Sequence, residues 1–286
     1  MLLGQELKEQ CPLCSGRKPL IILEGMSRSL VKCSHCGVAY LCPQPPESER
    51  VDFFSEEYIS TDEDVEVRFG TRPQKSLSKV ARYIHKRKIH GRILDLGCAG
   101  GHFLDAFFHA PDWDKWGVDL SKFAAQTAMT KSIRMHTGDI HSASLPPFSF
   151  DVVTVLDTFY YFPQPRRELE AIRKILKPDG LLVLVLTSAR SHIWRNTGWR
   201  TRVLGGSQGS LFESHHVFFY DPPAIRDTLS RSGFRIDSIH PLPAIDQGSF
   251  LRNGLAAGYF AMSVAGWCLS GARLMLGPRF FVAASP

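Results

Sequence analysis

Short apolar runs alternate with helical patterns from residue 92 to about residue 250, and this alternation constrains the fold more than any other feature. The apolar runs are Arg92–Leu96, Trp116–Leu120, Asp151–Leu156, Leu181–Thr187 and Phe234–Ile239. The helical patterns between them include Lys122–Lys131, Arg166–Leu176 and Pro223–Ser232. Parallel strands that are covered on both faces read as near-continuous apolar runs, and helices make the crossovers between them. The sequence therefore predicts an α/β fold with an open, mainly parallel sheet.

A glycine-rich turn follows the first apolar run and contains Gly97, Ala99 and Gly101. Glycines let a backbone approach a ligand closely, and the helix that begins there offers free N–H groups. The second run ends at Asp119, and a third segment ends at Gly138-Asp139-Ile140. Open α/β sheets bind their ligands beyond the carboxyl ends of the strands. We therefore expect three loops to converge on a nucleotide-like ligand.

The residues of this turn favour an adenosyl cation over a dinucleotide. A pyrophosphate site has the spacing G-x-G-x-x-G. Here Ala99 stands between Gly97 and Gly101, and Asp95 precedes them. A carboxylate in that place repels phosphates and suits an ammonium group, while Asp119 is placed to accept hydrogen bonds from ribose hydroxyls. The turn thus favours S-adenosylmethionine over NAD.

Residues 92–187 resemble the class I S-adenosylmethionine-dependent methyltransferases, and Asp95-Leu-Gly-Cys-Ala-Gly-Gly is similar to their first motif. The resemblance implies a Rossmann-like seven-stranded sheet whose last strand, at residues 280–284, is antiparallel to Phe234–Ile239. The family usually has glycine at position 99. Alanine tolerates most turn conformations short of a positive φ, so this departure is expected to be mild.

The resemblance also implies a set of donor-binding residues, which share a place at the carboxyl ends of the strands. They are Asp95, Gly97, Ala99 and Gly101 for the methionine part, Asp119 for the ribose, Leu120, Asp139 and Ile140 for the adenine, and Asp157 at the same mouth.

A base is needed if the methyl acceptor is a hydroxyl or an acidic carbon. Histidine titrates in the useful range, and His215 and His216 precede the strand-like segment at residues 217–220. Tyr160 and Tyr161 follow the fourth strand. The catalytic candidates are therefore His215, His216 and Tyr160, with Tyr161 beside it. The alternative interpretations are a structural histidine pair and an aromatic packing patch.

Two Cys-x-x-Cys pairs lie near the N-terminus, Cys11 with Cys14 and Cys33 with Cys36. Doubled pairs at this separation are typical of a tetrahedral zinc site, and the segment resembles a zinc ribbon. Four thiolates leave no open coordination position, so the predicted metal is structural. The hairpin between the pairs is expected from Leu20–Leu23 and Leu30–Lys32.

We predict three parts: a zinc ribbon at residues 1–45, a helical connector and lid at 46–90, and the methyltransferase domain at 91–286. The first residues lack an apolar signal segment, which predicts a cytoplasmic protein. Gly254–Ala272 is uncharged but rich in small residues, so a buried or amphipathic helix is expected rather than membrane insertion.

The predicted function is methyl transfer from S-adenosylmethionine to a small-molecule acceptor, such as a sugar or a nucleotide-linked metabolite. The net charge of +6 allows a nucleic-acid partner without favouring one. The alternatives are an RNA methyltransferase that uses the ribbon for RNA contact, and a non-catalytic donor-binding scaffold with a zinc docking module. The oligomeric state stays open.

Overall fold

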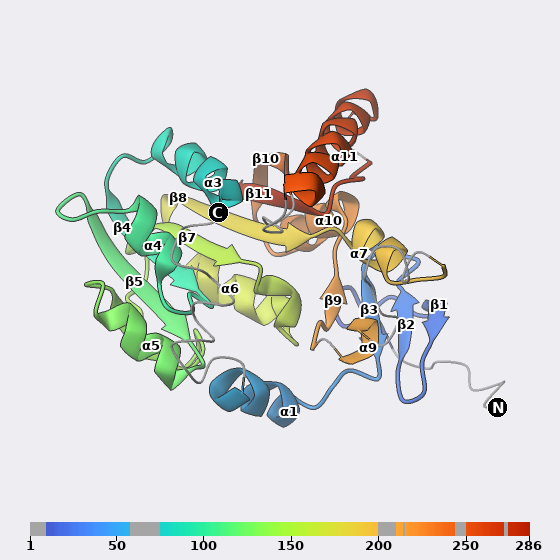
Figure 1. The fold of residues 1–286 in the computed structure, drawn as a ribbon. Coiled ribbons are helices and arrows are strands. Elements are labelled where there is room, and N and C mark those ends of the chain that lie inside the picture. Colours follow the sequence, from blue (N-terminus) through green and yellow to red (C-terminus); the bar gives the residue numbers. More distant parts are fainter. Residues whose placement is uncertain (1–9, 58–74, 200–209, 214, 244–249, 272–273) are drawn as a thin grey trace.

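The computed structural model describes residues 10–57, 75–199, 210–213, 215–243, 250–271 and 274–286 (Figure 1). It contains one large sheet flanked by helices and one small sheet to which the N-terminal segment contributes three strands.

The large sheet has seven strands in the order β10-β11-β8-β7-β4-β5-β6. Their bounds are β4 Gly91–Leu96, β5 Trp113–Asp119, β6 Arg134–Thr137, β7 Phe150–Leu156, β8 Leu176–Thr187, β10 Arg235–Leu242 and β11 Arg279–Ser285. Strand β11 is antiparallel to both β8 and β10, and the pairs among β4 to β8 are parallel. The predicted Rossmann-like sheet with its antiparallel last strand is confirmed.

Helices cover both faces of this sheet, because its central strands are apolar on both sides. Along β8, Leu182 and Leu184 join the core beneath α6 (Pro165–Ile175) and α10 (Pro222–Arg231), whereas Val183 and Val185 join the core beneath α3 (Lys75–His85) and α4 (His102–Phe107). The remaining helices are α1 Glu47–Asp52, α5 Lys122–Met129, α7 Ala189–Arg195, α9 Ser210–Glu213 and α11 Phe250–Leu269, with short turns η1 at Phe53–Glu57 and η2 at Phe159–Tyr161.

The small sheet has the order β1-β2-β3-β9, with β1 Leu20–Glu24, β2 Ser29–Lys32, β3 Ala39–Cys42 and β9 Phe218–Phe219. Strands β1 and β2 form the expected antiparallel hairpin. Strand β9 comes from the C-terminal half of the chain and pairs with β3, which the sequence analysis did not foresee. The N-terminal module is thereby joined to the large domain by backbone hydrogen bonds.

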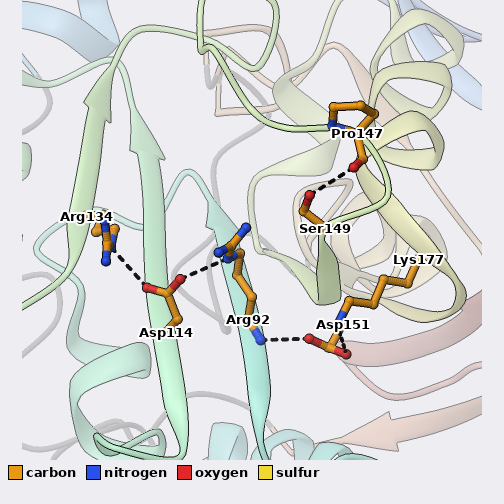
Figure 2. A network of polar contacts seen from close by, with 7 residues as sticks. All are labelled: Arg92, Asp114, Arg134, Pro147, Ser149, Asp151 and Lys177. Carbon is orange, nitrogen blue, oxygen red and sulfur yellow. Dashed lines mark hydrogen bonds and ion pairs between the residues drawn. The ribbon is translucent and has the colours of Figure 1, made fainter.

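Polar contacts link the amino ends of the central strands (Figure 2). Asp114 on β5 accepts from Arg92 on β4 at 2.9 Å and from Arg134 on β6 at 3.1 Å. Asp151 on β7 accepts from the Arg92 backbone N–H and from Lys177, both at 2.8 Å. These contacts link five neighbouring strands, β8, β7, β4, β5 and β6, at their amino ends. The cavity described next lies at the opposite edge of the sheet, at the carboxyl ends of the strands.

Candidate functional site

A cavity lies at the carboxyl ends of β4, β5, β6 and β7, with about 190 Å³ accessible to the centre of a water molecule. The turn after β4, the end of β5 and the loop after β6 form one side of it. Residues after β7 and residues from α1 and η1 form the other side. Three loops converge at this place, as expected from the sequence, so the cavity lies where an open α/β sheet binds its ligand.

The turn after β4 requires glycine at two positions. Gly97 and Gly101 both have φ of 72°, in the left-handed region. A Cβ at Gly97 would lie 2.5 Å from Thr158 Cγ2, and one at Gly101 would lie 2.4 Å from Ile133 Cδ1. Gly97 lines the cavity, whereas Gly101 caps α4 and is not among the lining residues. Gly101 therefore shapes the turn and does not line the cavity.

 
Ala99 has a φ of +46°, a left-handed conformation that costs an L-residue about 1–2 kcal/mol. Its N–H donates to Asp119 Oδ2 at 2.8 Å, and this bond helps to hold the strained conformation in place. The expectation that alanine here avoids a positive φ was wrong.

Asp119 ends β5 and lines the cavity with a fixed carboxylate. Its Oδ2 accepts from Ala99 N–H, and its Oδ1 accepts from Ser121 N–H at 2.9 Å. Burial raises the pKa of Asp119, and the backbone hydrogen bonds from Ser121, Ala99 and Leu120 oppose that rise. Each oxygen already has one backbone donor and keeps a lone pair, so the carboxylate can still accept hydrogen bonds from a ligand.

Asp95 lies on β4 beneath the cavity and is not among its lining residues. It is 3 % exposed, and its Oδ1 accepts from the Thr154 hydroxyl at 2.6 Å. Burial raises the pKa of Asp95 to about 7, against the hydrogen bond from Thr154 and with a further contribution from the charge of Asp119. The site therefore contains a carboxyl group that titrates near neutrality.

Leu120, Asp139 and Ile140 also line the cavity, on the side formed by β5 and β6. Asp139 Oδ1 accepts backbone N–H groups from Ser142 at 2.7 Å and from His141 at 3.1 Å. Burial opposes the ionisation of Asp139, but these hydrogen bonds and the proximity of His141 outweigh it and lower the pKa. The loop after β6 thus presents an ionised carboxylate next to two apolar side chains.

Asp157 lines the cavity at the end of β7 and forms an ion pair with Arg279 of β11. The Arg279 guanidinium is 4 % exposed and also donates to Ser76 Oγ at 3.1 Å. Asp157 has a φ of +53°, and the ion pair fixes this strained residue against the last strand. Sequence reasoning missed Arg279, because a single arginine in an apolar strand has no local pattern that announces its partner.

Residues from α1 and η1 form the far wall of the cavity, which sequence reasoning had described only as a connector and lid. Glu47, Arg50, Val51 and Phe54 line it. Arg50 is 8 % exposed, and its Nε has no hydrogen-bond partner among the described residues. A buried guanidinium with a free donor is unusual, because burying unpaired polar groups costs free energy. The polar and acidic composition of α1 gave no signal of this placement.

Aromatic side chains continue this wall. The Phe54 ring lies 4.7 Å from the Tyr161 ring, and Tyr161 and Phe162 line the cavity together with Thr158. Of the two candidate tyrosines, Tyr161 lines the cavity and Tyr160 does not. The short turn η2 turns the Tyr161 ring toward the cavity and buries its neighbour.

The predicted catalytic residues His215, His216 and Tyr160 are not among the residues that line the cavity. His215 stacks on Phe53 at 4.1 Å, and His216 packs on Tyr160 at 4.1 Å. Burial, with a contribution from His192, lowers the pKa of His216 to about 3, and burial raises the pKa of Tyr160 well above its usual value. His216 is therefore neutral at physiological pH and Tyr160 keeps its proton. The three residues form a layer behind Phe54 and Tyr161.

The four predicted cysteine ligands come together in the N-terminal module. Cys11 and Cys36 have their sulfurs 3.7 Å apart, and Cys14 and Cys33 have theirs 3.5 Å apart. All four sulfurs lie within 4.8 Å of one another. Ligand sulfurs about 2.3 Å from a tetrahedral centre lie about 3.8 Å apart, so the cluster fits a zinc ion. The hydrogen bond between Cys11 and Cys36 lowers the pKa of Cys11 to about 5.

The family model for a methyltransferase domain matches residues 69–239. The match covers more than half of the sequence, and the chain therefore belongs to the methyltransferase-domain family. It confirms the class that the turn after β4 indicated.

Curated relatives match about a third of the chain. A ubiquinone biosynthesis O-methyltransferase of Neisseria meningitidis is 29% identical over 99 residues, which is 32% of this chain and 42% of the relative. The uncharacterised methyltransferase YcgJ of Bacillus subtilis is 29% identical over 100 residues, which is 33% of this chain and 40% of the relative. The chain thus spans less than half the length of the curated relatives that it matches.

Solved structures share the fold. One chain of a complex that contains the Haloferax volcanii Trm112 methyltransferase activator has a TM-score of 0.56 at 17% identity, covering 78% of this chain and 92% of that one. An S-adenosylmethionine-dependent methyltransferase from Mesorhizobium loti has a TM-score of 0.54 at 20% identity, covering 74% and 98%.

Proposed function

We propose that this chain transfers a methyl group from S-adenosylmethionine to a small-molecule acceptor. The observation that carries the proposal is the carboxylate of Asp119, which the N–H groups of Ala99 and Ser121 hold at the cavity. A carboxylate at this point accepts hydrogen bonds from ribose hydroxyls. The family match and the methyltransferase names of the curated relatives support the same activity.

The donor would lie along the β4, β5 and β6 side of the cavity. Leu120 and Ile140 offer apolar contact for an adenine ring, and Asp139 offers an acceptor for its amino group. Asp95, when ionised, would place negative charge near the part of the cavity where the cationic half of the donor would lie. When bound, the donor supplies a methyl group on a sulfonium, and the protein aligns the acceptor atom at about 3–3.5 Å from it.

The acceptor would lie against the aromatic wall of Phe54, Tyr161 and Phe162. This wall favours a flat or ring-shaped small molecule, because aromatic rings pack well against such surfaces. Arg50 adds a buried guanidinium with an unpaired Nε, which suits an acceptor with an anionic or carbonyl group. The curated relatives named for ubiquinone biosynthesis support a small-molecule acceptor. A sugar or a nucleotide-linked metabolite fits the same description.

His215, His216 and Tyr160 stay candidates for a role in turnover, but their location favours positioning over direct proton transfer. They support Phe53, Phe54 and Tyr161 from behind. Tyr161 reaches the cavity itself and takes the place of Tyr160 as the side chain that would contact the acceptor.

We also infer that the N-terminal module binds one structural Zn²⁺ through Cys11, Cys14, Cys33 and Cys36. The fit of the four sulfurs to a tetrahedron supports this inference. Four thiolates complete the coordination shell, so the ion would stabilise the hairpin and leave no position for a substrate.

Two measurements test the proposed function. Calorimetry with S-adenosylmethionine should show binding to the wild type and strongly reduced binding to Asp119→Ala, while Asp112→Ala on the exposed surface serves as the control. Radiolabelled donor and fractionated cell extract should then give label in small metabolites. Absence of donor binding would reject the function, and label in RNA would reject the acceptor class. Binding without transfer to any fraction would favour the scaffold alternative.

A further inference from the structure

Helix α11 exposes a face that is made of small and apolar residues. The solvent-facing residues are Ala257, Gly258, Ala261, Met262, Ala265, Cys268 and Leu269, and we call them the outer face of α11. At 100° per residue they occupy one continuous arc, while Ser263 and Trp267 on the opposite side are buried. A surface helix of a globular domain ordinarily carries charged and polar residues on its outer side. The outer face of α11 instead carries only small and apolar residues.

The largest side chains of this face are also its most exposed. Met262 is 65% exposed and Leu269 is 89% exposed. They lie two helical turns apart on the same side, and the alanines and glycine around them let a partner surface come close. Figure 1 shows α11 at the periphery of the molecule, with its far end extending beyond the large sheet. The face is therefore open to an external surface.

Basic residues flank this helix in the sequence, and others lie on a neighbouring helix. The chain has no acidic or basic residue from Asn253 to Ala272, and the nearest charged residues in the sequence are Arg252 and Arg273. Helix α3 contacts α11 through Lys79, whose Nζ lies 4.8 Å from the centre of the Phe260 ring. Lys79 and Arg82 on α3, and Lys86 in the turn that follows it, are exposed, and we call these three residues the basic face of α3. The sequence has no acidic residue from Lys75 to Arg92 to neutralise them.

We propose that the outer face of α11 and the basic face of α3 together dock onto a membrane surface that contains anionic lipids. Apolar side chains that enter the interface beside lysine and arginine are the combination that holds a helix in the plane of such a surface. The helix lies on the membrane and does not cross it. In the described residues no helix has the length and apolar character needed for a span.

A second copy of the chain fits this surface less well. Symmetric self-association would bring the outer faces of two α11 helices together, and it would also bring the two basic faces of α3 close to each other. Like charges oppose that contact, whereas anionic headgroups attract every one of these side chains. The docking surface is separate from the donor cavity, so this proposal does not rest on the proposed methyl transfer.

Vesicle co-sedimentation of the full, zinc-loaded chain tests the proposal. We expect binding to phosphatidylcholine vesicles with about 30 mol% phosphatidylglycerol, weaker binding to phosphatidylcholine alone, and loss of binding as salt is raised. Met262→Glu and Leu269→Glu should each weaken binding about tenfold or more, and so should the pair Arg82→Glu and Lys86→Glu. Met129→Glu is the matched control, because Met129 is 61% exposed on α5 and belongs to neither face.

Circular dichroism and thermal melting of each variant establish that the fold is intact. Failure of the wild type to bind anionic vesicles, or binding that Met262→Glu and Leu269→Glu leave unchanged, would overturn the proposal. Sedimentation velocity covers the rival occupant. A dimer that Met262→Glu dissociates, with no vesicle binding by the wild type, would assign the face to a second copy instead.

Discussion

The carboxylate of Asp119 accepts the backbone N–H of Ala99 at 2.8 Å, which ties the end of β5 to the turn after β4. The bond joins two segments that follow different strands, so the turn after β4 and the end of β5 form one side of the cavity together. Its strength comes from the charge of the carboxylate, because hydrogen bonds to ionised acceptors are stronger than neutral ones.

Replacement of Asp119 by asparagine tests this arrangement. The side-chain amide would present an NH₂ group to one of the two N–H donors and would remove an acceptor from the ribose position. We expect the dissociation constant for S-adenosylmethionine to rise about tenfold or more. Calorimetry measures it, with Asp112→Asn as the control. Equal affinity of Asp119→Asn and wild type would contradict the placement of the ribose.

The strained turn predicts opposite effects for two substitutions. Ala99→Gly relieves a φ of +46° and should raise the free energy of unfolding by about 1 kcal/mol, reduced by the greater freedom of glycine in the unfolded chain. Gly97→Ala adds a Cβ at 2.5 Å from Thr158 Cγ2 and should cost about 2–4 kcal/mol. Gly271→Ala is the control, since its φ is +60° but a Cβ there meets nothing within 4 Å. Urea titration gives all three values.

Asp95 predicts a pH dependence of donor binding. Its pKa of about 7 in the folded protein lies above the ordinary value of 3.8, so the folded protein keeps this proton until the pH rises through 7. A cationic donor favours the ionised form, and below pH 7 binding must displace the proton. Affinity for S-adenosylmethionine should therefore fall as the pH falls from 8 to 6. Calorimetry across this range should give a flatter profile for Asp95→Asn.

The same group has the opposite effect on the stability of the ligand-free protein. Because the folded state binds the proton more tightly than the unfolded state, the contribution of Asp95 is complete below pH 4 and is lost as the pH rises through 7. Asp95→Asn should remove this slope between pH 4 and 7. If the free energy of unfolding changes equally between pH 4 and 7 in the wild type and in Asp95→Asn, the raised pKa of Asp95 is refuted.

The sequence was sufficient for most strands of the large sheet and for the loops on one side of the cavity, because both are encoded locally. The apolar runs gave β4, β5, β7, β8 and β10, and the glycine turn with Asp119 and Asp139 gave three loops that do meet. The doubled cysteine pairs gave a cluster with the right geometry. Each of these signals consists of short motifs that can be read from neighbouring residues.

Features that depend on long-range contacts were not predictable. The pairing of β9 with β3 joins Phe218 to Tyr40, and no periodicity in either segment announces it. Arg50 reached the cavity because α1 packs over the carboxyl ends of the strands, which its polar sequence does not indicate. The choice between Tyr160 and Tyr161 depends on the direction of one short turn, so adjacent residues of the same type could not be told apart.

The ion pair between Asp157 and Arg279 predicts a coupled effect on stability. Arg279→Met would leave the Asp157 carboxylate without its partner, and Asp157→Asn would leave a buried guanidinium uncompensated. We expect each single change to lower the free energy of unfolding by about 2–4 kcal/mol. The double variant should be less destabilised than the sum of the two. Strict additivity in urea titrations would show that the two side chains do not interact.

Removal of the metal should affect more than the N-terminal segment, because β9 belongs to the same sheet as β1, β2 and β3. A mercurial reagent in the presence of a chelator should release about one zinc ion per chain. Cys14→Ser should bind less zinc. Cys268→Ser, on the exposed face of α11, is the control and should release as much zinc as the wild type. Hydrogen exchange should then quicken from Cys11 to Cys42 and also at residues 217–220, whose backbone bonds to β3 and Tyr160 depend on the module. Faster exchange confined to the first segment would show that β9 keeps its place without the metal and that the two parts are independent.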